Sequence, residues 1–172
     1  MEKNKIGVGT IRKDKVLTFF EVSLWGTMVM VPLLLPGPQL VVGSVINMAL
    51  VVGAMRLDQK RWWMMVILPS LTVMMRGVLF GSLTSFLIYF LPMIWLGNWV
   101  LMKVICLLER RAWWERMLVA SLAKMLILWM GASLYFSLEI VPLMFVTAMG
   151  VMQGITAVLG GVGAQLILKN TK

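Results

Sequence analysis

The chain has 172 residues, of which 60% are hydrophobic and 13% charged, and its mean hydropathy is +0.92. No soluble core needs that much apolar surface, so the composition excludes an ordinary soluble domain. The formal net charge is +9, there is no histidine, and Cys106 is the single cysteine. An internal disulfide and a His/Cys zinc site are therefore excluded, and no cofactor is expected.

Six apolar segments follow one another along the chain, and each approaches or exceeds the length needed to cross a bilayer. A hydrocarbon core of about 30 Å takes about 20 helical residues at a rise of about 1.5 Å each. The pattern predicts an all-α polytopic membrane protein, a single compact six-helix domain over residues 1–172 with a basic segment over 1–15. The six segments are Val16–Leu35, Gln39–Met55, Trp62–Leu79, Leu83–Leu108, Met117–Leu138 and Ile140–Leu168.

Lysines and arginines are concentrated in alternate connections between these segments, which sets the predicted topology. They form neither one face nor a basic tail, so nucleic-acid binding is not expected. The positive-inside rule instead places both termini in the cytoplasm, in a multi-pass protein of the cell membrane. Thirteen of the sixteen basic residues then fall on the cytoplasmic side: Lys3, Lys5, Arg12, Lys13, Lys15, Arg56, Lys60, Arg61, Arg110, Arg111, Arg116, Lys169 and Lys172.

The polar side chains within the apolar segments are the candidates for functional residues. An ionised group at the bilayer centre costs at least about 2.5 kcal/mol, so each should face protein, water or a ligand. A solute cavity built from the outer parts of the segments would be mainly apolar with a few placed polar groups, as binding sites are. By depth, its candidate residues are Gln39, Asn47, Arg76, Tyr89, Trp95, Trp129, Tyr135, Thr147 and Gln153.

Some of these polar groups also have a purely structural interpretation. Lys103 lies close enough to the cytoplasmic end of its segment to extend its ammonium to the headgroups, and Arg76 can do the same at the outer surface. Lys124 lies deeper, where an ion pair with Glu21 is as good an interpretation as contact with a ligand. Asn98 is grouped with these intramembrane polar residues.

Prolines and glycines lie within the later apolar segments. Pro69 and Pro92 each release a carbonyl of the preceding turn, which either opens a cavity or only kinks the helix. Glycines at close spacing let another helix approach the backbone, and this is the expected role of Gly160-Gly161-x-Gly163. The earlier pair, Gly150-x-x-x-Gly154, serves either close packing or space for a bound molecule beside Gln153.

Five short motifs occur in a fixed order over residues 20–168. They are Gly37-Pro38-x-x-Val41-x-Gly43-x-x-x-Asn47, Arg76-Gly77, Pro92-x-x-x-x-Gly97-Asn98, Ala123-Lys124 and Met152-Gln153-x-x-Thr156-Ala157-x-x-Gly160-Gly161. In this order they resemble the substrate-binding S components of energy-coupling-factor (ECF) transporters, which belong to the ABC type. The resemblance implies a vitamin-type solute bound in an outward-facing cavity. It also implies two kinds of partner, a transmembrane coupling protein and a pair of ATPase subunits.

The first segment departs from that family in its docking motif. The family often carries an Ala-x-x-x-Ala pair there for contact with the coupling protein, whereas this chain has Ser23-x-x-x-Thr27 with Gly26 beside them. Small residues at this spacing still allow close helix approach. Ser23, Gly26 and Thr27 are therefore the predicted docking residues.

The sequence leaves the solute open. Met side chains fit irregular shapes, so the 17 methionines suit a cavity for a large molecule such as the corrinoid cobalamin, another tetrapyrrole or a smaller vitamin. The same methionines would also serve as lipid-facing filler. Nickel or cobalt ions are not expected as solutes because their usual imidazole ligands are missing.

A different class of function stays open beside transport. A membrane scaffold that organises other membrane proteins would need no outward cavity, and its polar residues would serve only helix packing. An enzyme is not expected, because no histidine, carboxylate pair or nucleophile with a base lies within the segments. The chain also lacks a phosphate-binding loop of the Gly-rich type, so any ATP hydrolysis would belong to another subunit.

Overall fold

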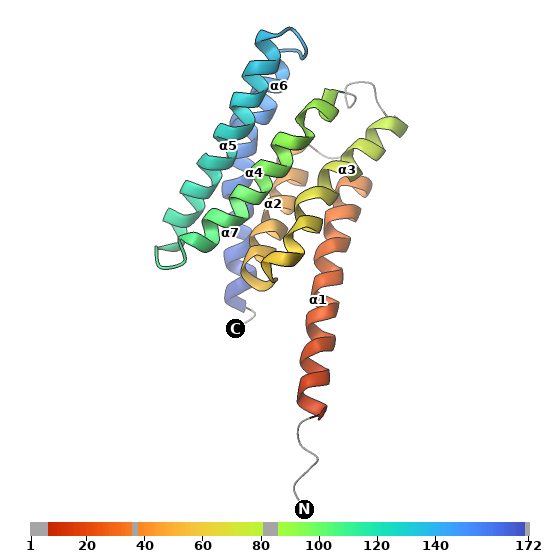
Figure 1. Cartoon of the computed structure of the whole chain (residues 1–172), viewed down its shortest axis with the longest axis vertical. Coiled ribbons are helices and arrows are strands. Elements are labelled where there is room, and N and C mark those ends of the chain that lie inside the picture. The colour runs from red at the N-terminus through yellow and green to blue at the C-terminus, as the bar shows by residue number, and fades with distance from the viewer. Residues whose placement is uncertain (1–6, 36–37, 81–85, 171–172) are drawn as a thin grey trace, which may run out of the picture.

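The computed structural model describes residues 7–35, 38–80 and 86–170, with side chains over 19–35, 38–76 and 86–170. Within these ranges the chain forms helices and short connections, which confirms the all-α prediction (Figure 1). Gly37, Leu83 and the first six residues of the basic N-terminal segment lie outside the described residues. The helices are α1 (Gly7–Leu34), α2 (Gln39–Arg56), the short 3₁₀ helix η1 (Gln59–Arg61), α3 (Trp62–Phe80), α4 (Leu87–Leu107), α5 (Trp113–Ser137), α6 (Met144–Met149) and α7 (Val151–Asn170).

Four helical regions among the described residues are long and apolar enough to cross a membrane. A fifth apolar helix, Phe19–Leu34 of α1, is shorter. Because an isolated soluble domain has no use for four such helices, the chain is a helical membrane protein. The four regions are Gln39–Arg56, Leu87–Leu107, Trp113–Ser137 and Met144–Asn170.

Glycines bring α2 and α7 into direct backbone contact at the centre of the bundle. A Cβ atom on Gly160 would lie 2.6 Å from the backbone nitrogen of Met48 and 2.7 Å from the Cβ of Asn47. The next glycine, Gly161, lies against the side chain of Met117 from α5. The close packing expected of these two glycines is therefore confirmed, and α2 makes its most extensive helix contact with α7.

The sixth apolar segment is not one helix, which corrects the sequence interpretation. It breaks at Gly150, whose φ of −90° and ψ of −104° are not helical, into α6 and α7. A Cβ on Gly150 would lie 2.7 Å from the carbonyl oxygen of Val146 and 2.8 Å from Cδ1 of Trp129. Gly154 in turn lies against Met125. Packing against α5 thus fills the space beside this glycine pair.

The two ends of the bundle differ in composition. The connection between α4 and α5 and the end of α7 lie at the same end of the molecule, whereas α6 lies at the opposite end (Figure 1). The end that holds the α4–α5 connection carries Arg110, Arg111 and Lys169, and the connection before α3 adds Lys60 and Arg61. We call it the basic end. The helix α1 lies at one edge of the bundle, against α3 and α2.

Candidate functional site

A cavity of about 370 Å³ lies inside the bundle and is lined by every helix from α1 to α7. Its walls are largely apolar and include Pro32, Pro69, Phe145 and Met149. Pro69 thus lies where a proline-opened cavity was expected, while Pro92 is not among the lining residues. The polar lining residues are Gln39, Asn47, Ser70, Arg76, Asn98, Lys124 and Gln153.

Lys124 is the deepest charged group of this cavity and is held by two amides. Its side chain is 3% exposed, and its Nζ donates to Oδ1 of Asn47 at 2.6 Å and to Oδ1 of Asn98 at 2.7 Å. The amide nitrogens point away, since Nδ2 of Asn47 donates to Oγ1 of Thr156 at 3.1 Å and Nδ2 of Asn98 donates to the carbonyl of Val66 at 3.1 Å. The ammonium of Lys124 and its two amide acceptors therefore link five helices, which are α2, α3, α4, α5 and α7.

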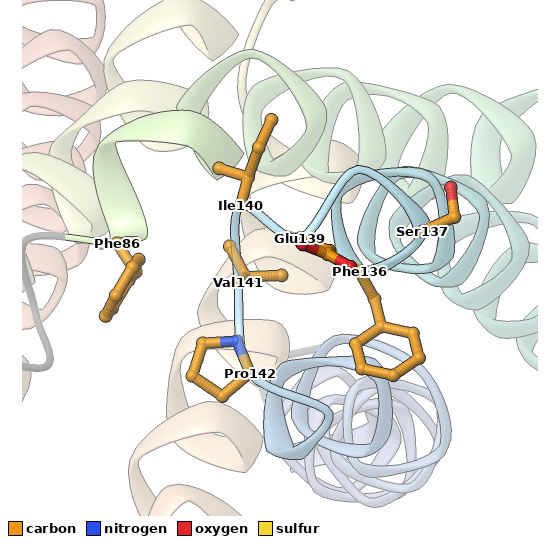
Figure 2. Close-up of a pocket in the computed structure, with 7 residues that line it drawn as sticks. All are labelled: Phe86, Phe136, Ser137, Glu139, Ile140, Val141 and Pro142. Carbon is orange, nitrogen blue, oxygen red and sulfur yellow. The ribbon is translucent and has the colours of Figure 1, made fainter.

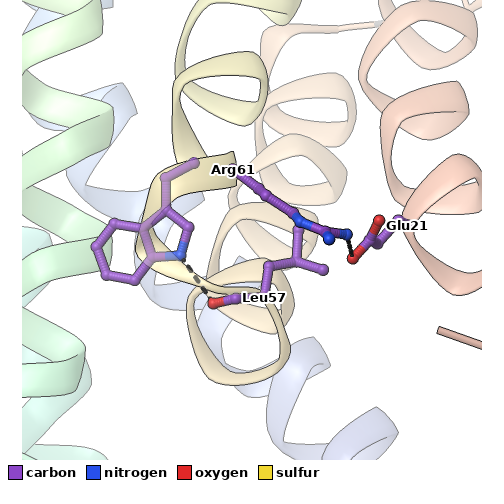
Figure 3. A network of polar contacts seen from close by, with 4 residues as sticks. Glu21, Leu57 and Arg61 are labelled. Carbon is purple, nitrogen blue, oxygen red and sulfur yellow. Dashed lines mark hydrogen bonds and ion pairs between the residues drawn. The ribbon is translucent and has the colours of Figure 1, made fainter. Parts of the chain in front are cut away.

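The ion pair between Glu21 and Lys124, left open by the sequence, is not formed. Glu21 pairs instead with Arg61 of η1, as Figure 3 shows. Two residues before η1, the carbonyl of Leu57 accepts from Nε1 of Trp62 at 3.2 Å. Lys124 faces amides rather than a carboxylate. Among the described lining residues of the cavity, the charged groups are Arg76 and Lys124 and none is acidic.

Two further polar residues connect the helix ends around the cavity. Nη1 of Arg76 donates to the carbonyls of Pro32 and Leu35 at 3.2 and 3.0 Å, so this arginine caps the end of α1 as well as lining the cavity. Nε2 of Gln39 donates to the carbonyl of Ala148 at 2.8 Å and joins the start of α2 to α6. The cavity thus reaches the end of the bundle opposite the basic end.

Five of the nine predicted cavity residues do not line it. Trp95 does not line the cavity but contacts a lining residue, because its Nε1 donates to Oγ of Ser70 at 2.8 Å. Tyr135 packs edge-on against Phe90, with ring centroids 5.4 Å apart. The remaining three, all exposed on the outside of the bundle, are Tyr89, Trp129 and Thr147. Of the predicted set, the structure brings Gln39, Asn47, Arg76 and Gln153 together.

Three cavity residues were assigned elsewhere or missed by sequence reasoning. Lys124 and Asn98 were grouped with intramembrane structural residues, and Ser70 was not singled out. Ser70 follows Pro69 directly, so its position one residue after a mid-helix proline was the available signal. Lys103, in contrast, lies away from the cavity, where its Nζ donates to Oε1 of Gln59 at 3.3 Å near the basic end.

The predicted docking residues lie on an uncovered part of α1. The hydroxyls of Ser23 and Thr27 bond within the helix, to the carbonyls of Phe19 and Ser23 at 2.9 and 2.8 Å. A Cβ on Gly26 would meet nothing within 4 Å, and Phe19 and Val22 are exposed. Ser23 is exposed and Gly26 and Thr27 are partly buried, so the strip is partly accessible to lipid or to another helix.

A second hollow, of about 630 Å³, follows the connection between α5 and α6 (Figure 2). Phe86 and Phe136 contribute aromatic walls, and Glu139 is its one ionisable lining residue among those described. Glu139 has a φ of 57°, the only positive φ of a residue other than glycine in the described part of the chain. This residue is exposed, so the hollow has none of the buried polar contacts that mark the central cavity.

The central cavity has the composition of a small-molecule binding site. Two cations, four amides and one hydroxyl project into a largely apolar space, which suits a small molecule that carries an anionic group and a few hydrogen-bonding atoms. No protein-family model, curated protein or solved structure matches this chain.

Proposed function

We propose that the chain is the membrane-embedded solute-binding subunit, or S component, of an ECF transporter. The observation that carries the proposal is the convergence of dispersed motifs on one cavity. Each of the five motifs of the resemblance supplies a residue that lines it. These residues are Asn47, Arg76, Asn98, Lys124 and Gln153, which lie far apart in the sequence.

The proposed topology has six membrane crossings with both termini in the cytoplasm of the cell. The crossings are α1, α2, α3, α4, α5 and the pair α6 and α7. Support comes from the basic end, because the positive-inside rule places it in the cytoplasm. The central cavity then faces outward, through the end of the bundle where Arg76 and Gln39 lie.

The cavity favours a small anionic solute of the vitamin type. Its volume of about 370 Å³ lies near the lower end of the roughly 300–1,000 Å³ found for sites of drug-sized molecules. A corrinoid such as cobalamin is far larger than such molecules, so we favour a smaller vitamin. An ammonium has three donors, and two of those on Lys124 bond to amides. We assign the third to a carboxylate or similar anion of the solute.

Uptake in this proposal depends on partners. A transmembrane coupling protein would contact the strip of α1 around Ser23, Gly26 and Thr27, where small side chains and open space allow close helix approach. Two ATPase subunits bound to the coupling protein would supply the energy. The chain itself would bind and deliver the solute.

The test is mass spectrometry of the solute retained when the full chain is purified from its native membrane in mild detergent. We expect a bound small molecule with the wild type and with Lys103→Met, and its loss with Lys124→Met. Both variants remove one ammonium from the same kind of helix, but only Lys124 lines the cavity. Thermal denaturation of the solute-free proteins checks that Lys124→Met still folds.

The scaffold alternative predicts a different outcome. A scaffold would be recovered with other membrane proteins, without ATPase subunits and without a retained solute. That result would overturn the proposal.

A further inference from the structure

A third hollow, of about 420 Å³, lies at the basic end, away from the solute cavity. It is formed where the last turns of α2 and α7 meet the first turn of α5. We call it the basic groove. Three of its lining residues, Arg56, Arg116 and Lys169, are cationic, and none of those described is acidic.

Arg116 is the fixed cation of this groove. Its side chain is 7% exposed, and its Nε and Nη2 donate to the carbonyl of Ile105 at 3.0 and 2.7 Å. The guanidinium also lies over the ring of Trp113, 5.2 Å from the centroid, and Nε1 of Trp113 donates to the carbonyl of Gly161 at 3.3 Å. Both the cation and the ring beneath it are therefore held in place.

The charge of Arg116 is not balanced by a carboxylate. Within the described residues, its partners are a carbonyl, a thioether and an indole ring, and no ion pair is formed with Asp or Glu. A buried cation without a carboxylate favours an anionic ligand close by. Arginine forms paired hydrogen bonds with phosphate in particular, because the fork of its guanidinium matches the phosphate oxygens.

The groove joins these cations to an apolar wall. Met55 precedes Arg56 at the end of α2, and Leu168 precedes Lys169 in the last turn of α7. Trp113 adds an indole of the kind found at headgroup depth in membrane proteins. Positive charge and apolar side chains in one groove match the junction between the headgroup and the acyl chains of a phospholipid.

We propose that the basic groove binds the phosphate of an anionic phospholipid, with Arg116, Arg56 and Lys169 around the headgroup and an acyl chain along Met55 and Leu168. Basic pockets between transmembrane helices on the cytoplasmic side are sites of this type. The proposal is independent of the transport function, because it uses none of the residues of the solute cavity.

The test measures lipid binding to the full chain in a neutral detergent by native mass spectrometry. Phosphatidylglycerol and phosphatidylcholine with identical acyl chains are added in separate titrations, and inorganic phosphate is added as a competitor. We expect one phosphatidylglycerol to be retained per chain, in preference to phosphatidylcholine. Inorganic phosphate should displace it weakly, because the apolar wall contributes to lipid binding alone.

Two charge-matched double variants locate the site. Arg56→Gln with Lys169→Gln removes two cations of the groove and leaves Arg116, which also holds the end of α4, in place. Lys60→Gln with Arg110→Gln removes two exposed cations at the same end but outside the groove. Each cation near an anionic headgroup is worth roughly a fivefold change in affinity, so the first variant should bind roughly 25-fold more weakly. The second should bind within about twofold of the wild type, since neither of its residues lines the groove.

Three results would overturn the proposal. Equal weakening in both variants would indicate diffuse attraction by the basic end. Equal retention of the two lipids would indicate an apolar contact alone. Complete displacement by inorganic phosphate at the same concentration as the lipid would indicate a site for the free anion.

Discussion

The ammonium of Lys124 lies 2.6 Å from Oδ1 of Asn47, although the two residues are separated by 77 positions in the sequence. Both side chains are buried at the centre of the bundle, and the amide accepts from the ammonium without neutralising it. Asn98 repeats the contact from α4 at 2.7 Å. Among the described residues no carboxylate pairs with Lys124, which is the basis of the first prediction.

Asn47→Asp should abolish most solute binding while the fold is retained. The new carboxylate would form an ion pair with Lys124 and compete with an anionic solute for its ammonium. A hydrogen bond to a charged group is worth about 1.5–3 kcal/mol, so the loss should be about tenfold or more. The measurement is the amount of solute retained per purified chain.

The control for Asn47→Asp is Gln59→Glu, which makes the same amide-to-carboxylate change beside a different lysine. Oε1 of Gln59 accepts from Lys103 at 3.3 Å, outside the cavity. This variant should keep its solute. Full retention by Asn47→Asp would show that the cavity does not bind an anion through Lys124.

Gly160→Ala should destabilise the bundle, by about 1–3 kcal/mol, as overpacking does in well-packed cores. The new Cβ would lie 2.6 Å from the backbone nitrogen of Met48, and a backbone cannot rotate away as a side chain can. The helices α2 and α7 would have to separate. The readout is the midpoint of thermal denaturation in detergent.

Gly26→Ala is the matched control for that prediction. A Cβ at Gly26 meets nothing within 4 Å, and alanine is the better helix former by up to about 1 kcal/mol. Its denaturation midpoint should stay the same or rise. A similar fall in both variants would mean that the loss at Gly160 is not caused by helix contact.

Hydropathy predicted the helix boundaries well where an apolar segment begins at the edge of the membrane. The observed α2 begins at the predicted Gln39, and α3 begins at the predicted Trp62. The predicted start of the fifth helix at Met117 is too late, because α5 begins at Trp113 with a polar first turn that no lipid requirement marks. The break at Gly150 was missed because the hydropathy stays high without interruption across Met144–Asn170.

The cavity was harder to predict than the helices. The sequence shows how deep a residue lies in the membrane, but it does not show whether its side chain faces the inside of the bundle or the lipid. A membrane helix that is apolar on all sides gives no pattern that distinguishes its inward face. Depth therefore selected Gln39 and Asn47, which line the cavity, together with Thr147 and Trp129, which are exposed. For Lys124 the sequence left an ion pair and contact with a ligand open, and its observed partners are amides rather than a carboxylate.

Arg61→Gln should destabilise the protein more than Glu21→Gln, although both remove the same ion pair. The Arg61 side chain is 45% exposed and can turn to water when its partner is lost, whereas the Glu21 side chain is 6% exposed. Removing the arginine leaves a buried acceptor without its donor, at a cost of about 1–3 kcal/mol. Thermal denaturation of the two variants under identical conditions makes the comparison. Equal destabilisation would show that Glu21 gains no more from the pair than Arg61 does.

Gly26→Leu and Ser23→Leu should weaken assembly with the coupling protein and the ATPases while solute binding stays intact. Both residues lie on the open strip of α1, where a leucine side chain would project into the space that a second helix needs. Neither lines the solute cavity, so the bound solute should be retained.

The matched control for docking is Thr147→Leu, which adds the same bulk to an exposed side chain on α6. Co-purification of ATPase subunits with each tagged variant is compared with the wild type, alongside the amount of retained solute. The two α1 variants should lose the ATPases and keep the solute, and Thr147→Leu should keep both. Undiminished ATPase recovery with Gly26→Leu and Ser23→Leu would move the docking surface away from α1, because a leucine at the centre of a close helix contact forces the two backbones apart.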